Sequence, residues 1–329
     1  MSKKVFMTRK ILEPGLGMIR EKYQLDIWES ELAPPKEEII KRGKDADALV
    51  TLLTDPIDAE VIDACKNLKV IAQYAVGFNN IDVEYATKKG IIVTNTPGVL
   101  TESTADFTWA LLMSIARRTV EGDEYVRTGQ WKVGWGPTIL IGTDVFGKTL
   151  GIIGAGRIGR AVARRSKGFG MKVLYYTRTR TEEHDKLDEE IGSKQVDLET
   201  LLKESDYISL HVPLTSETRH MLGEKEFKMM KKTAILINTA RGQVIDEKIL
   251  IKALQEGWIA GAALDVFTVE PLPLDSPLIK MKNVVLAPHA GSASLETRSK
   301  MAKMVAENLI LALEGKRPPN IVNPEVLGD

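Results

Sequence analysis

The sequence predicts an α/β protein with parallel sheets, divided into two domains. Short runs rich in β-branched residues alternate with segments whose apolar residues recur at helical spacing. This alternation is typical of βαβ units, in which parallel strands form the sheet and helices cover it. Among the 329 residues, one βα series ends near residue 100 and a second follows it. Each series is long enough for a domain of its own.

The first series contains the N-terminal strands. The predicted strands are Lys4–Thr8, Ala48–Leu53, Lys69–Tyr74 and Ile91–Thr94. Between them, Ile57–Asn67 and Asn80–Lys89 carry apolar residues at helical spacing, and Gly90 stands where a helix cap is expected. These segments predict βαβ units in the first hundred residues.

A long helix and an irregular segment separate the two series. Thr101–Arg117 opens with Thr and Ser residues that suit a helix N-cap, and its two apolar faces predict burial on both sides. Thr128–Gly147 contains Trp131 and Trp135 among glycines and is interrupted by Pro137. We therefore expect an irregular loop or arm there.

The second series shows a stronger alternation. Its predicted strands are Thr149–Ile153, Lys172–Tyr176, Tyr207–His211, Ala234–Asn238, Gly261–Val266 and Val284–Ala287. A final helix is predicted over Ser294–Glu314, with Gly315 ending it ahead of two prolines. This series is long enough for a second α/β domain.

Composition excludes several classes of protein. Lys plus Arg and Asp plus Glu both number 45, so the formal net charge is zero and favours neither nucleic acid nor an anionic membrane as partner. No apolar stretch approaches the roughly 18 to 20 residues of a membrane helix, and the start lacks a signal-peptide core. Cys65 is the only cysteine, which excludes an intramolecular disulfide and a cysteine-based zinc cluster. We predict a cytoplasmic protein without a metal site.

A glycine-rich turn predicts a dinucleotide site. Gly154-Ala155-Gly156-Arg157-Ile158-Gly159 follows the strand Thr149–Ile153 and opens a helix, and the strand Lys172–Tyr176 completes the unit. The first glycine allows a tight turn, the second lets the backbone approach a pyrophosphate, and the third lets the helix pack on the strand. An ordinary glycine turn is the alternative, but the strand-turn-helix context favours a cofactor.

The end of the next strand bears on the choice of cofactor. NAD-preferring sites usually place Asp or Glu there to hold the ribose hydroxyls. Here the chain reads Thr177-Arg178-Thr179-Arg180, and the first carboxylate is Glu182. Arg178, Thr179 and Arg180 suit a 2′-phosphate, so we predict NADP(H) as the preferred cofactor, with NAD(H) possible. The alternative is that both arginines are solvated surface charges.

The four histidines differ in context. His184 lies in a charged run and is predicted to be solvated, while His220 carries no signal. His211 ends its strand at the carboxyl edge of the sheet, where lining a cofactor and a capping or packing role are both open. His289 follows the strand Val284–Ala287 in a loop of small residues, which favours presentation of its ring to a cleft.

Three successive strand ends bring Arg241, Glu270 and His289 to one region. Reduction of a 2-oxo acid needs a cation that binds the carboxylate and polarises the ketone, and an acid that protonates the forming alkoxide. Arg241 and His289 meet these needs, and Glu270 beside the histidine would stabilise the protonated imidazole.

These motifs resemble the signatures of the D-isomer-specific 2-hydroxyacid dehydrogenases. The resemblance includes Asp265-Val266-Phe267 to Glu270-Pro271 and Pro288-His289-Ala290-Gly291, in the right order over nearly the whole chain. Within the family, the sequence is most similar to the glyoxylate/hydroxypyruvate reductases. The resemblance implies Arg241 as the substrate-binding arginine, Glu270 as the partner of the histidine and His289 as the proton donor.

The resemblance also implies ligand contacts. Asp265 would meet the nicotinamide amide, and Val212, Pro213, Thr239 and Ala240 would line the cofactor cleft. The pyrophosphate would contact the residues that open the helix, which are Arg157, Ile158, Gly159, Arg160 and Ala161. The backbone N–H groups of the loop Ala75-Val76-Gly77 would hold the substrate carboxylate, with Leu53 nearby. The local pattern agrees, because a glycine after a strand lets the main chain approach a ligand.

The family fold implies two doubly wound parallel-sheet (Rossmann-like) domains with the active site in the interdomain cleft. Residues 1–99 and 290–329 would form a discontinuous substrate-binding domain, and residues 100–289 the dinucleotide-binding domain. Trp131 and Trp135 would lie on an arm that embraces a second subunit in a homodimer, although ordinary core or interface packing is the alternative.

The activity implied is hydride transfer from NAD(P)H to a small 2-oxo acid, glyoxylate or hydroxypyruvate. A D-lactate or phosphoglycerate type of dehydrogenase is one alternative. A non-enzymatic NAD(H)-sensing, corepressor-like binding protein is another, because a fold does not fix a function.

Overall fold

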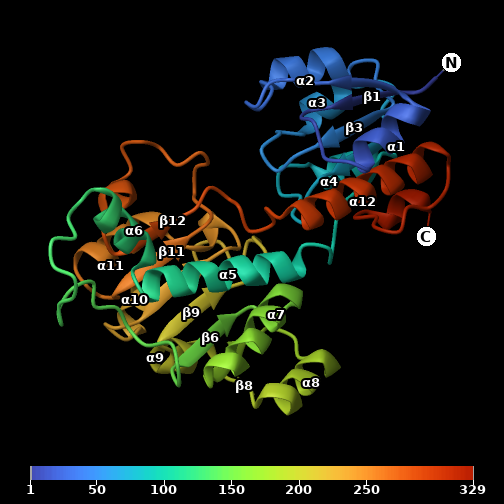
Figure 1. The fold of residues 1–329 in the computed structure, drawn as a ribbon. Helices are drawn as coiled ribbons and strands as arrows, with labels where there is room; N and C mark the ends of the chain where they lie inside the picture. The colour runs from blue at the N-terminus through green and yellow to red at the C-terminus, as the bar shows by residue number, and fades with distance from the viewer. Residues whose placement is uncertain (1, 329) are drawn as a thin grey trace. The chain divides into compact units, whose positions relative to one another are not determined.

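The computed structural model describes residues 2–328, which form two compact units (Figure 1). Unit 1 runs to Leu100 and resumes at Ala293, and unit 2 comprises Thr101–Ser292. Both units are α/β and each holds one parallel sheet, so the predicted fold class is confirmed. None of the helices in the described part of the chain combines the length and apolar character needed to span a bilayer.

Unit 1 has a five-stranded sheet in the order β2-β1-β3-β4-β5. The strands are β1 (Lys4–Met7), β2 (Gln24–Ile27), β3 (Ala48–Thr51), β4 (Val70–Gln73) and β5 (Ile92–Thr94). The helices are α1 (Gly15–Lys22), α2 (Lys36–Gly43), α3 (Ala59–Ala64), α4 (Val83–Lys88) and α12 (Leu295–Leu313). A short 3-10 turn, Pro324–Leu327, follows α12.

Both faces of this sheet are buried. Val5 and Met7 of β1 belong to a core cluster with residues of α1 and α12, whereas Phe6 belongs to a second cluster with residues of α2 and α3. Successive side chains of a strand point to opposite faces, so the two clusters lie on the two sides of the sheet. Strands buried on both faces read as continuous apolar runs, which explains why β1, β3 and β4 were predictable.

Unit 2 has a seven-stranded sheet in the order β12-β11-β10-β9-β6-β7-β8. The strands are β6 (Thr149–Ile153), β7 (Lys172–Tyr176), β8 (Lys194–Gln195), β9 (Tyr207–Leu210), β10 (Ile235–Asn238), β11 (Gly261–Leu264) and β12 (Val284–Leu286). The strand order reverses between β6 and β9. In an open parallel sheet, the carboxyl ends of the strands at such a reversal form the usual ligand site.

Helices and short 3-10 turns complete unit 2. The helices are α5 (Thr101–Ala116), α6 (Thr119–Arg127), α7 (Arg157–Arg165), α8 (Glu182–Ile191), α9 (Leu198–Glu204), α10 (Glu224–Met229) and α11 (Glu247–Gln255). The 3-10 turns are Ser166–Phe169, Gly242–Val244 and Pro277–Lys280. The segment between α6 and β6 holds no helix or strand, as predicted.

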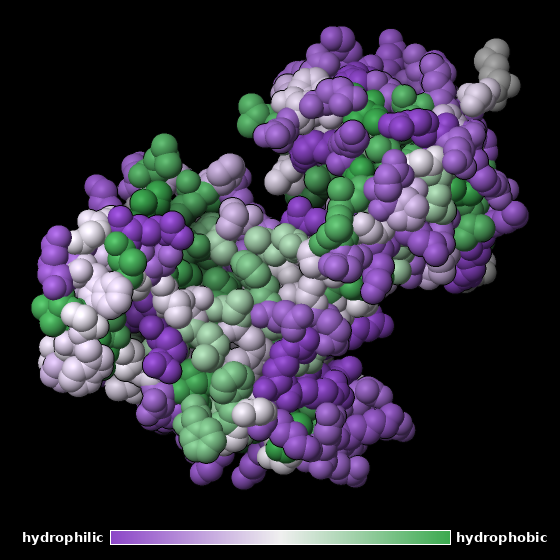
Figure 2. All heavy atoms as spheres, viewed as in Figure 1, coloured by the Kyte–Doolittle hydropathy of each residue, from purple (hydrophilic) through white to green (hydrophobic). Residues whose placement is uncertain are grey.

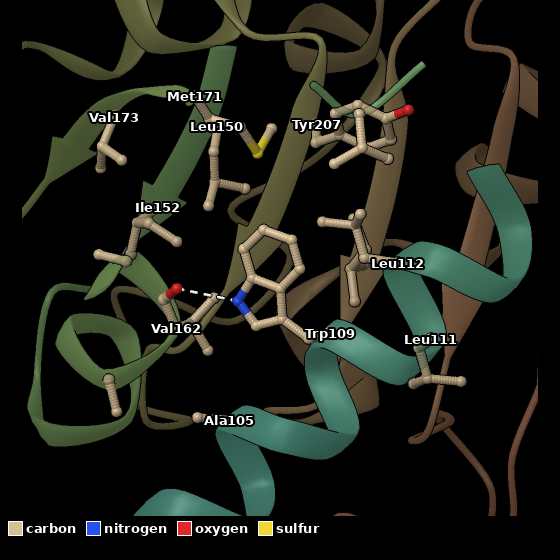
Figure 3. Packing of buried hydrophobic residues seen from close by; sticks show 14 of the residues in the cluster. Ala105, Trp109, Leu111, Leu112, Leu150, Ile152, Val162, Met171, Val173 and Tyr207 are labelled. Carbon is tan, nitrogen blue, oxygen red and sulfur yellow. Dashed lines mark hydrogen bonds between the residues drawn. The ribbon is translucent and has the colours of Figure 1, made fainter. Parts of the chain in front are cut away.

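Trp109 ties α5 to α7 in the core of unit 2 (Figure 3). Its side chain is 6% exposed, its Nε1 donates to the Val162 carbonyl at 2.9 Å, and its ring stacks on Phe169 at 4.7 Å. Removing such a buried aromatic side chain costs about 3–5 kcal/mol. The contact fixes the helix that begins at the glycine-rich turn.

The predicted elements differ from the observed ones in instructive ways. Strands β6 and β7 have the predicted bounds, while the short strands β2 and β8 and the helix α6 were not predicted. Helix α5 buries Trp109, Leu111 and Leu112 but leaves Ala110 exposed, so the expectation of two fully buried faces is only partly correct.

Candidate functional site

A histidine-carboxylate pair lies beyond the carboxyl ends of β11 and β12. His289 Nδ1 and Glu270 Oε2 are 2.7 Å apart, and Glu270 Oε1 accepts a hydrogen bond from the Phe267 N–H at 3.0 Å. Because Nδ1 faces the carboxylate, the ring nitrogen left for a ligand is Nε2. Within residues 2–328, Nε2 makes no hydrogen bond. This arrangement suits a proton donor or acceptor held in one orientation.

The loop that carries His289 is fixed by Asp265, the residue after β11. The Asp265 carbonyl accepts from the His289 N–H at 2.9 Å, and its carboxylate accepts from the N–H groups of Ala290 at 2.6 Å and Gly291 at 2.8 Å. His289 has a left-handed backbone, with φ of +54°. A non-glycine residue adopts this conformation at a cost, so the surrounding hydrogen bonds hold it there.

The pKa values of the two carboxyl groups, Asp265 and Glu270, are shifted in opposite directions. Burial raises the pKa of Asp265, against the opposing effect of its two backbone hydrogen bonds. Burial also acts to raise the pKa of Glu270, but the hydrogen bond and charge of His289, the Phe267 N–H and the charge of Arg241 outweigh it, so the pKa is lowered. Glu270 is therefore an anion at neutral pH, and it favours a protonated partner.

Arg241 follows β10 and lies close to this pair. Burial lowers the pKa of Arg241, and the charge of Glu270 acts in the opposite direction. Its Nη1 donates to the Ala240 carbonyl at 2.7 Å, and Asn238 holds the turn through the Ala240 N–H and the Arg241 carbonyl, each at 3.0 Å. The guanidinium remains ionised, since an arginine keeps its proton even when buried.

Gly242 allows the ends of β10 and β11 to approach. A Cβ atom at this position would lie 2.0 Å from the carbonyl carbon of Phe267, closer than any real contact. Only glycine fits here. The structure thus brings Arg241, Glu270 and His289 together from the three strand ends that the sequence indicated.

The glycine-rich turn has the geometry of a phosphate cradle. Gly154 has φ of +95°, and a Cβ at Gly159 would lie 2.2 Å from the Gly154 carbonyl oxygen. A Cβ at Gly156 would meet no atom within 4 Å, and no side chain caps the N-terminus of α7, which starts at Arg157. The first N–H groups of a helix are free donors and carry its positive dipole end. These residues fit a dinucleotide pyrophosphate.

The remaining residues expected near the cofactor surround this turn. A Cβ at Gly154 would lie 2.7 Å from Val212 Cγ1, the Pro213 carbonyl accepts from Thr218 Oγ1 at 2.6 Å, and Thr239 Oγ1 lies 2.9 Å from Thr108 Oγ1. In the first turns of α7, Ile158 is half-buried and Ala161 is buried, while Arg160 Nη1 donates to the Ala155 carbonyl at 3.1 Å. These residues share the carboxyl edge of the sheet near β6 and β9.

The two candidate phosphate-binding arginines have different surroundings. The Nε, Nη1 and Nη2 atoms of Arg180 donate to Asp185, Asp188, the Tyr175 hydroxyl and Gln195. Arg178 and Thr179 are exposed. Within residues 2–328 the Arg178 guanidinium makes no hydrogen bond or ion pair. The two arginines therefore differ: the donors of Arg180 are used by groups of its own chain, whereas Arg178 is open to a ligand. The binding of a 2′-phosphate by either arginine stays a prediction.

His184 is not solvated, and that prediction is wrong. Its side chain is 3% exposed, its Nδ1 accepts from the Thr181 N–H at 3.0 Å, and its Nε2 lies 3.0 Å from the Ala155 carbonyl. Since Nδ1 is an acceptor, Nε2 carries the proton and donates to Ala155 in the glycine-rich turn. The threonine three residues before the histidine, as in a capping box, was the available signal.

His211 is a packing residue. Its Nε2 lies 2.8 Å from Ser209 Oγ, its Nδ1 is buried without a partner in the described chain, and burial lowers its pKa to about 3. The ring is therefore neutral at physiological pH. Of the two roles left open by the sequence, these contacts favour packing.

The predicted substrate-binding residues of unit 1 lie in the loops after β3 and β4. Leu53 is half-buried in the first loop, and Val76 and Gly77 are half-buried in the second. The carbonyl of Val76 accepts from Asn95 Nδ2 at 2.8 Å, and that of Gly77 from Gln73 Nε2 at 3.2 Å. Within residues 2–328, the N–H groups of Val76 and Gly77 donate to no protein group. Two adjacent free N–H groups suit a carboxylate.

The segment after α6 exposes large apolar side chains. Trp131 is 53% exposed and Trp135 is 79% exposed, and Val133, Ile141 and Phe146 are exposed too. In Figure 2 apolar residues also gather on the surface of unit 2 over α5. Packing of the two tryptophans in the core of their own chain is excluded. Exposed apolar side chains of this kind suit burial against a partner.

Comparisons with known proteins identify the family. The model of the NAD-binding domain of D-isomer-specific 2-hydroxyacid dehydrogenases matches residues 109–291. A glyoxylate reductase of Korarchaeum cryptofilum (strain OPF8) is 63% identical over 327 residues, which cover 99% of this chain and 98% of the relative. A crystal structure of a Thermus thermophilus protein has a TM-score of 0.91 and 47% identity, covering 97% of this chain and 99% of that one.

A third similar protein has bound ligands. The NADPH-dependent glyoxylate/hydroxypyruvate reductase of Sinorhizobium meliloti, solved in complex with NADP and malonate, has a TM-score of 0.84 and 31% identity, covering 98% of this chain and 97% of that one. The resemblance found in the sequence motifs is confirmed by these comparisons. The chain belongs to the family of D-isomer-specific 2-hydroxyacid dehydrogenases.

Proposed function

We propose that this protein is a glyoxylate reductase that reduces glyoxylate to glycolate, and hydroxypyruvate to D-glycerate. The observation that carries the proposal is the Glu270–His289 pair, at 2.7 Å, with His289 Nε2 free of protein partners in residues 2–328 and Arg241 close by. The similarity over the full chain to the glyoxylate reductase of Korarchaeum cryptofilum supports the choice of substrate.

The roles of the residues follow from their chemistry. In unit 2, Arg241 binds the substrate carboxylate and polarises the ketone. In unit 1, the Val76 and Gly77 N–H groups suit a carboxylate as well. His289 Nε2 gives its proton to the oxygen that becomes the alcohol, and Glu270 stabilises the protonated ring before that transfer. In the reverse direction, the neutral imidazole accepts the proton from the alcohol.

The dinucleotide belongs in unit 2. A nicotinamide cofactor, when bound, supplies the hydride. Residues Arg157 to Ala161 at the start of α7 would hold the pyrophosphate, and Asp265 the nicotinamide amide. Four residues at the ends of β9 and β10 would line the rest of the cofactor site: Val212, Pro213, Thr239 and Ala240.

We also propose that NADPH is preferred over NADH. Arg178 offers an exposed guanidinium without an ion pair in the described chain, and Thr179 offers a hydroxyl beside it. A guanidinium presents a fixed fork of donors to phosphate oxygens. Arg180 acts as an anchor of the loop, because its donors are used by Asp185 and Asp188 of α8.

The assembly proposed is a homodimer in the cytoplasm. The exposed Trp131 and Trp135 would be buried by a second copy of the chain, which removes an apolar surface from water. The single cysteine, Cys65, is buried and unpaired, in keeping with a reducing compartment.

The test is an initial-rate assay of cofactor oxidation with glyoxylate, using NADPH and NADH side by side. We expect turnover with a higher kcat/KM for NADPH, and a loss of about 10²- to 10⁴-fold in kcat in His289→Asn. Asparagine tolerates the left-handed backbone of this position, so the variant tests the proton transfer rather than the loop. Tight cofactor binding without turnover of any small 2-oxo acid would overturn the proposal in favour of a cofactor-sensing binding protein.

A further inference from the structure

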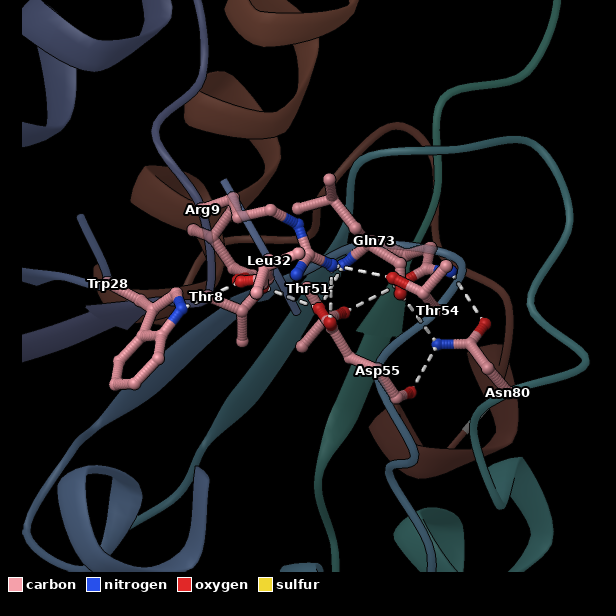
Figure 4. Close-up of polar contacts among 11 residues, drawn as sticks. Thr8, Arg9, Trp28, Leu32, Thr51, Thr54, Asp55, Gln73 and Asn80 are labelled. Atoms are coloured by element: carbon pink, nitrogen blue, oxygen red, sulfur yellow. Dashed lines mark hydrogen bonds and ion pairs between the residues drawn. The ribbon is translucent and has the colours of Figure 1, made fainter. Parts of the chain in front are cut away.

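Two amide side chains, one buried and one half-buried, connect the loops that carry the proposed substrate-binding residues of unit 1 (Figure 4). Gln73, the last residue of β4, is 0% exposed. Its Nε2 donates to the Gly77 carbonyl at 3.2 Å and to Asn80 Oδ1 at 2.7 Å. Asn80 Nδ2 in turn donates to the carbonyls of Leu52 and Asp55, both at 2.9 Å. Leu53 lies between these two carbonyls.

The orientation of the Gln73 amide is determined by the Gly77 carbonyl and Asn80 Oδ1, which can only accept and so must face Nε2. The Thr51 hydroxyl then donates to Gln73 Oε1 at 2.6 Å. A flipped amide would place Oε1 against the Gly77 carbonyl and Asn80 Oδ1, and three acceptors would then face one another. Buried polar networks in which every member is satisfied hold a single arrangement.

The Leu53 loop is also held by the buried carboxylate of Asp55, which lies in the same loop. Asp55 is 0% exposed and accepts from the Leu52 N–H at 2.6 Å, from Thr8 Oγ1 at 2.5 Å and from Arg9 Nη2 at 2.6 Å. A buried carboxylate is tolerated only when it is paired and hydrogen-bonded, as this one is. The loop is therefore fixed to β1 on one side and to Asn80 on the other.

In residues 2–328 the carbonyls of Ala75, Val76 and Gly77 all accept hydrogen bonds, while the N–H groups of Val76 and Gly77 donate to no protein group. Ala75 O accepts from the Thr96 N–H at 2.9 Å, Val76 O from Asn95 and Gly77 O from Gln73. In a planar trans peptide the C=O and N–H groups point in opposite directions. Holding the carbonyls of Ala75 and Val76 thus sets the direction of the Val76 and Gly77 N–H groups, and the bond to Gln73 fixes the next peptide.

We propose that Gln73 is a positioning residue for the substrate, which couples the Leu53 loop to the Val76-Gly77 loop through its hydrogen bonds to Gly77 and Asn80. The inference rests on the proposed function, because only there do these loops bind the substrate carboxylate. Gln73 itself contacts no substrate. It sets the separation of the two loops, and its bond to the Gly77 carbonyl holds the peptide that follows the Val76 and Gly77 N–H groups.

The test compares Gln73→Met with a matched control. Methionine has a similar length and no donor, so it leaves Gly77 O and Asn80 Oδ1 without their partner. We expect KM for glyoxylate to rise about ten-fold, the loss from one weakened charge-assisted hydrogen bond, while KM for the cofactor is unchanged. The control is Asn323→Leu, because Asn323 is also 0% exposed and its amide donates to Thr87 and Ile91, away from both loops. The control should lower Tm without raising KM for glyoxylate.

A second variant covers the case in which Gln73→Met does not fold. Thr51→Val removes only the hydroxyl that donates to Gln73 Oε1, which loosens the amide, and we expect a rise of about two- to five-fold in KM for glyoxylate. An unchanged KM in a variant of Gln73 or Thr51 that folds, or an equal rise in Asn323→Leu, would overturn the inference alone. Absence of glyoxylate turnover in the unmodified protein would overturn the proposed function and this inference with it.

Discussion

The loop after β7 contains two arginines with different surroundings, and a pair of substitutions tests which of them binds the 2′-phosphate of NADPH as proposed. Arg178→Ala removes the exposed guanidinium, which makes no ion pair within residues 2–328. A charge-assisted hydrogen bond to a phosphate contributes about 1.5–3 kcal/mol, so the Kd for NADPH should rise about 10- to 100-fold. NADH has no 2′-phosphate, and its Kd should change less than about three-fold.

Arg180→Ala is the matched comparison two residues along the chain. Its guanidinium is engaged with Asp185 and Asp188 of α8, with Tyr175 and with Gln195, so its loss should affect the anchoring of the loop. We expect both cofactors to bind less tightly by a similar, small factor. The ratio of the two Kd values should therefore remain near that of the unmodified protein.

The assay is a fluorescence titration of each reduced cofactor into each variant, with no substrate present. Binding alone is measured, so the result does not depend on turnover. A larger change of the NADPH/NADH ratio in Arg180→Ala than in Arg178→Ala would refute the reasoning from hydrogen-bond partners. Equal loss of both cofactors in Arg178→Ala would refute its role as a phosphate ligand.

Three further predictions concern the site and the surface. Because the pKa of Glu270 is lowered in the folded state, its ionised carboxylate stabilises the fold at pH values above the ordinary pKa of 4.5. This stabilisation is lost as the pH falls through the lowered pKa. Tm of the unmodified protein should therefore fall in that acid range more steeply than Tm of Glu270→Gln, whereas parallel curves would contradict the pairing with His289. Gly242→Ala should lower the free energy of unfolding, measured in urea, by about 3 kcal/mol or more, because its Cβ would lie 2.0 Å from the Phe267 carbonyl carbon. Gly168→Ala is the control, since a Cβ at that position would meet no atom within 4 Å and should leave the free energy of unfolding nearly unchanged. Trp135→Lys should shift the mass in light scattering from dimer to monomer, and an unchanged mass would refute the interface.

The sequence predicted the parts of the fold in which local pattern and tertiary environment agree. Strand β6 is buried on both faces, so its apolar run and the following glycines identify the element and its end together. Strand β2 alternates exposed and partly buried residues at the edge of its sheet, and β8 has only two residues. Such short edge strands carry little pattern of their own.

The misassigned residues are those whose partners come from another element. His184 and Arg180 both lie in a run of charged residues, which by itself is typical of a solvated surface. The phase of α8 turns His184 toward the glycine-rich turn and places Asp185 and Asp188 beside Arg180. The charge of the run favoured a solvated surface, and only the packing of the helix shows which residues these side chains contact.

The hydrogen bond between His184 and Ala155 belongs to a set of contacts that forms a framework around the glycine-rich turn, and Arg178 is not part of this framework. His184, Arg180 and the carboxylates of α8 join the loop, the helix and the glycine-rich turn through buried or paired groups. Arg178 projects from this framework without an ion pair in the described chain. A substitution at position 178 therefore changes the charge of this loop while the framework persists. Under the role proposed for Arg178, the preference between the two cofactors can change in evolution without loss of the bonds that hold the fold.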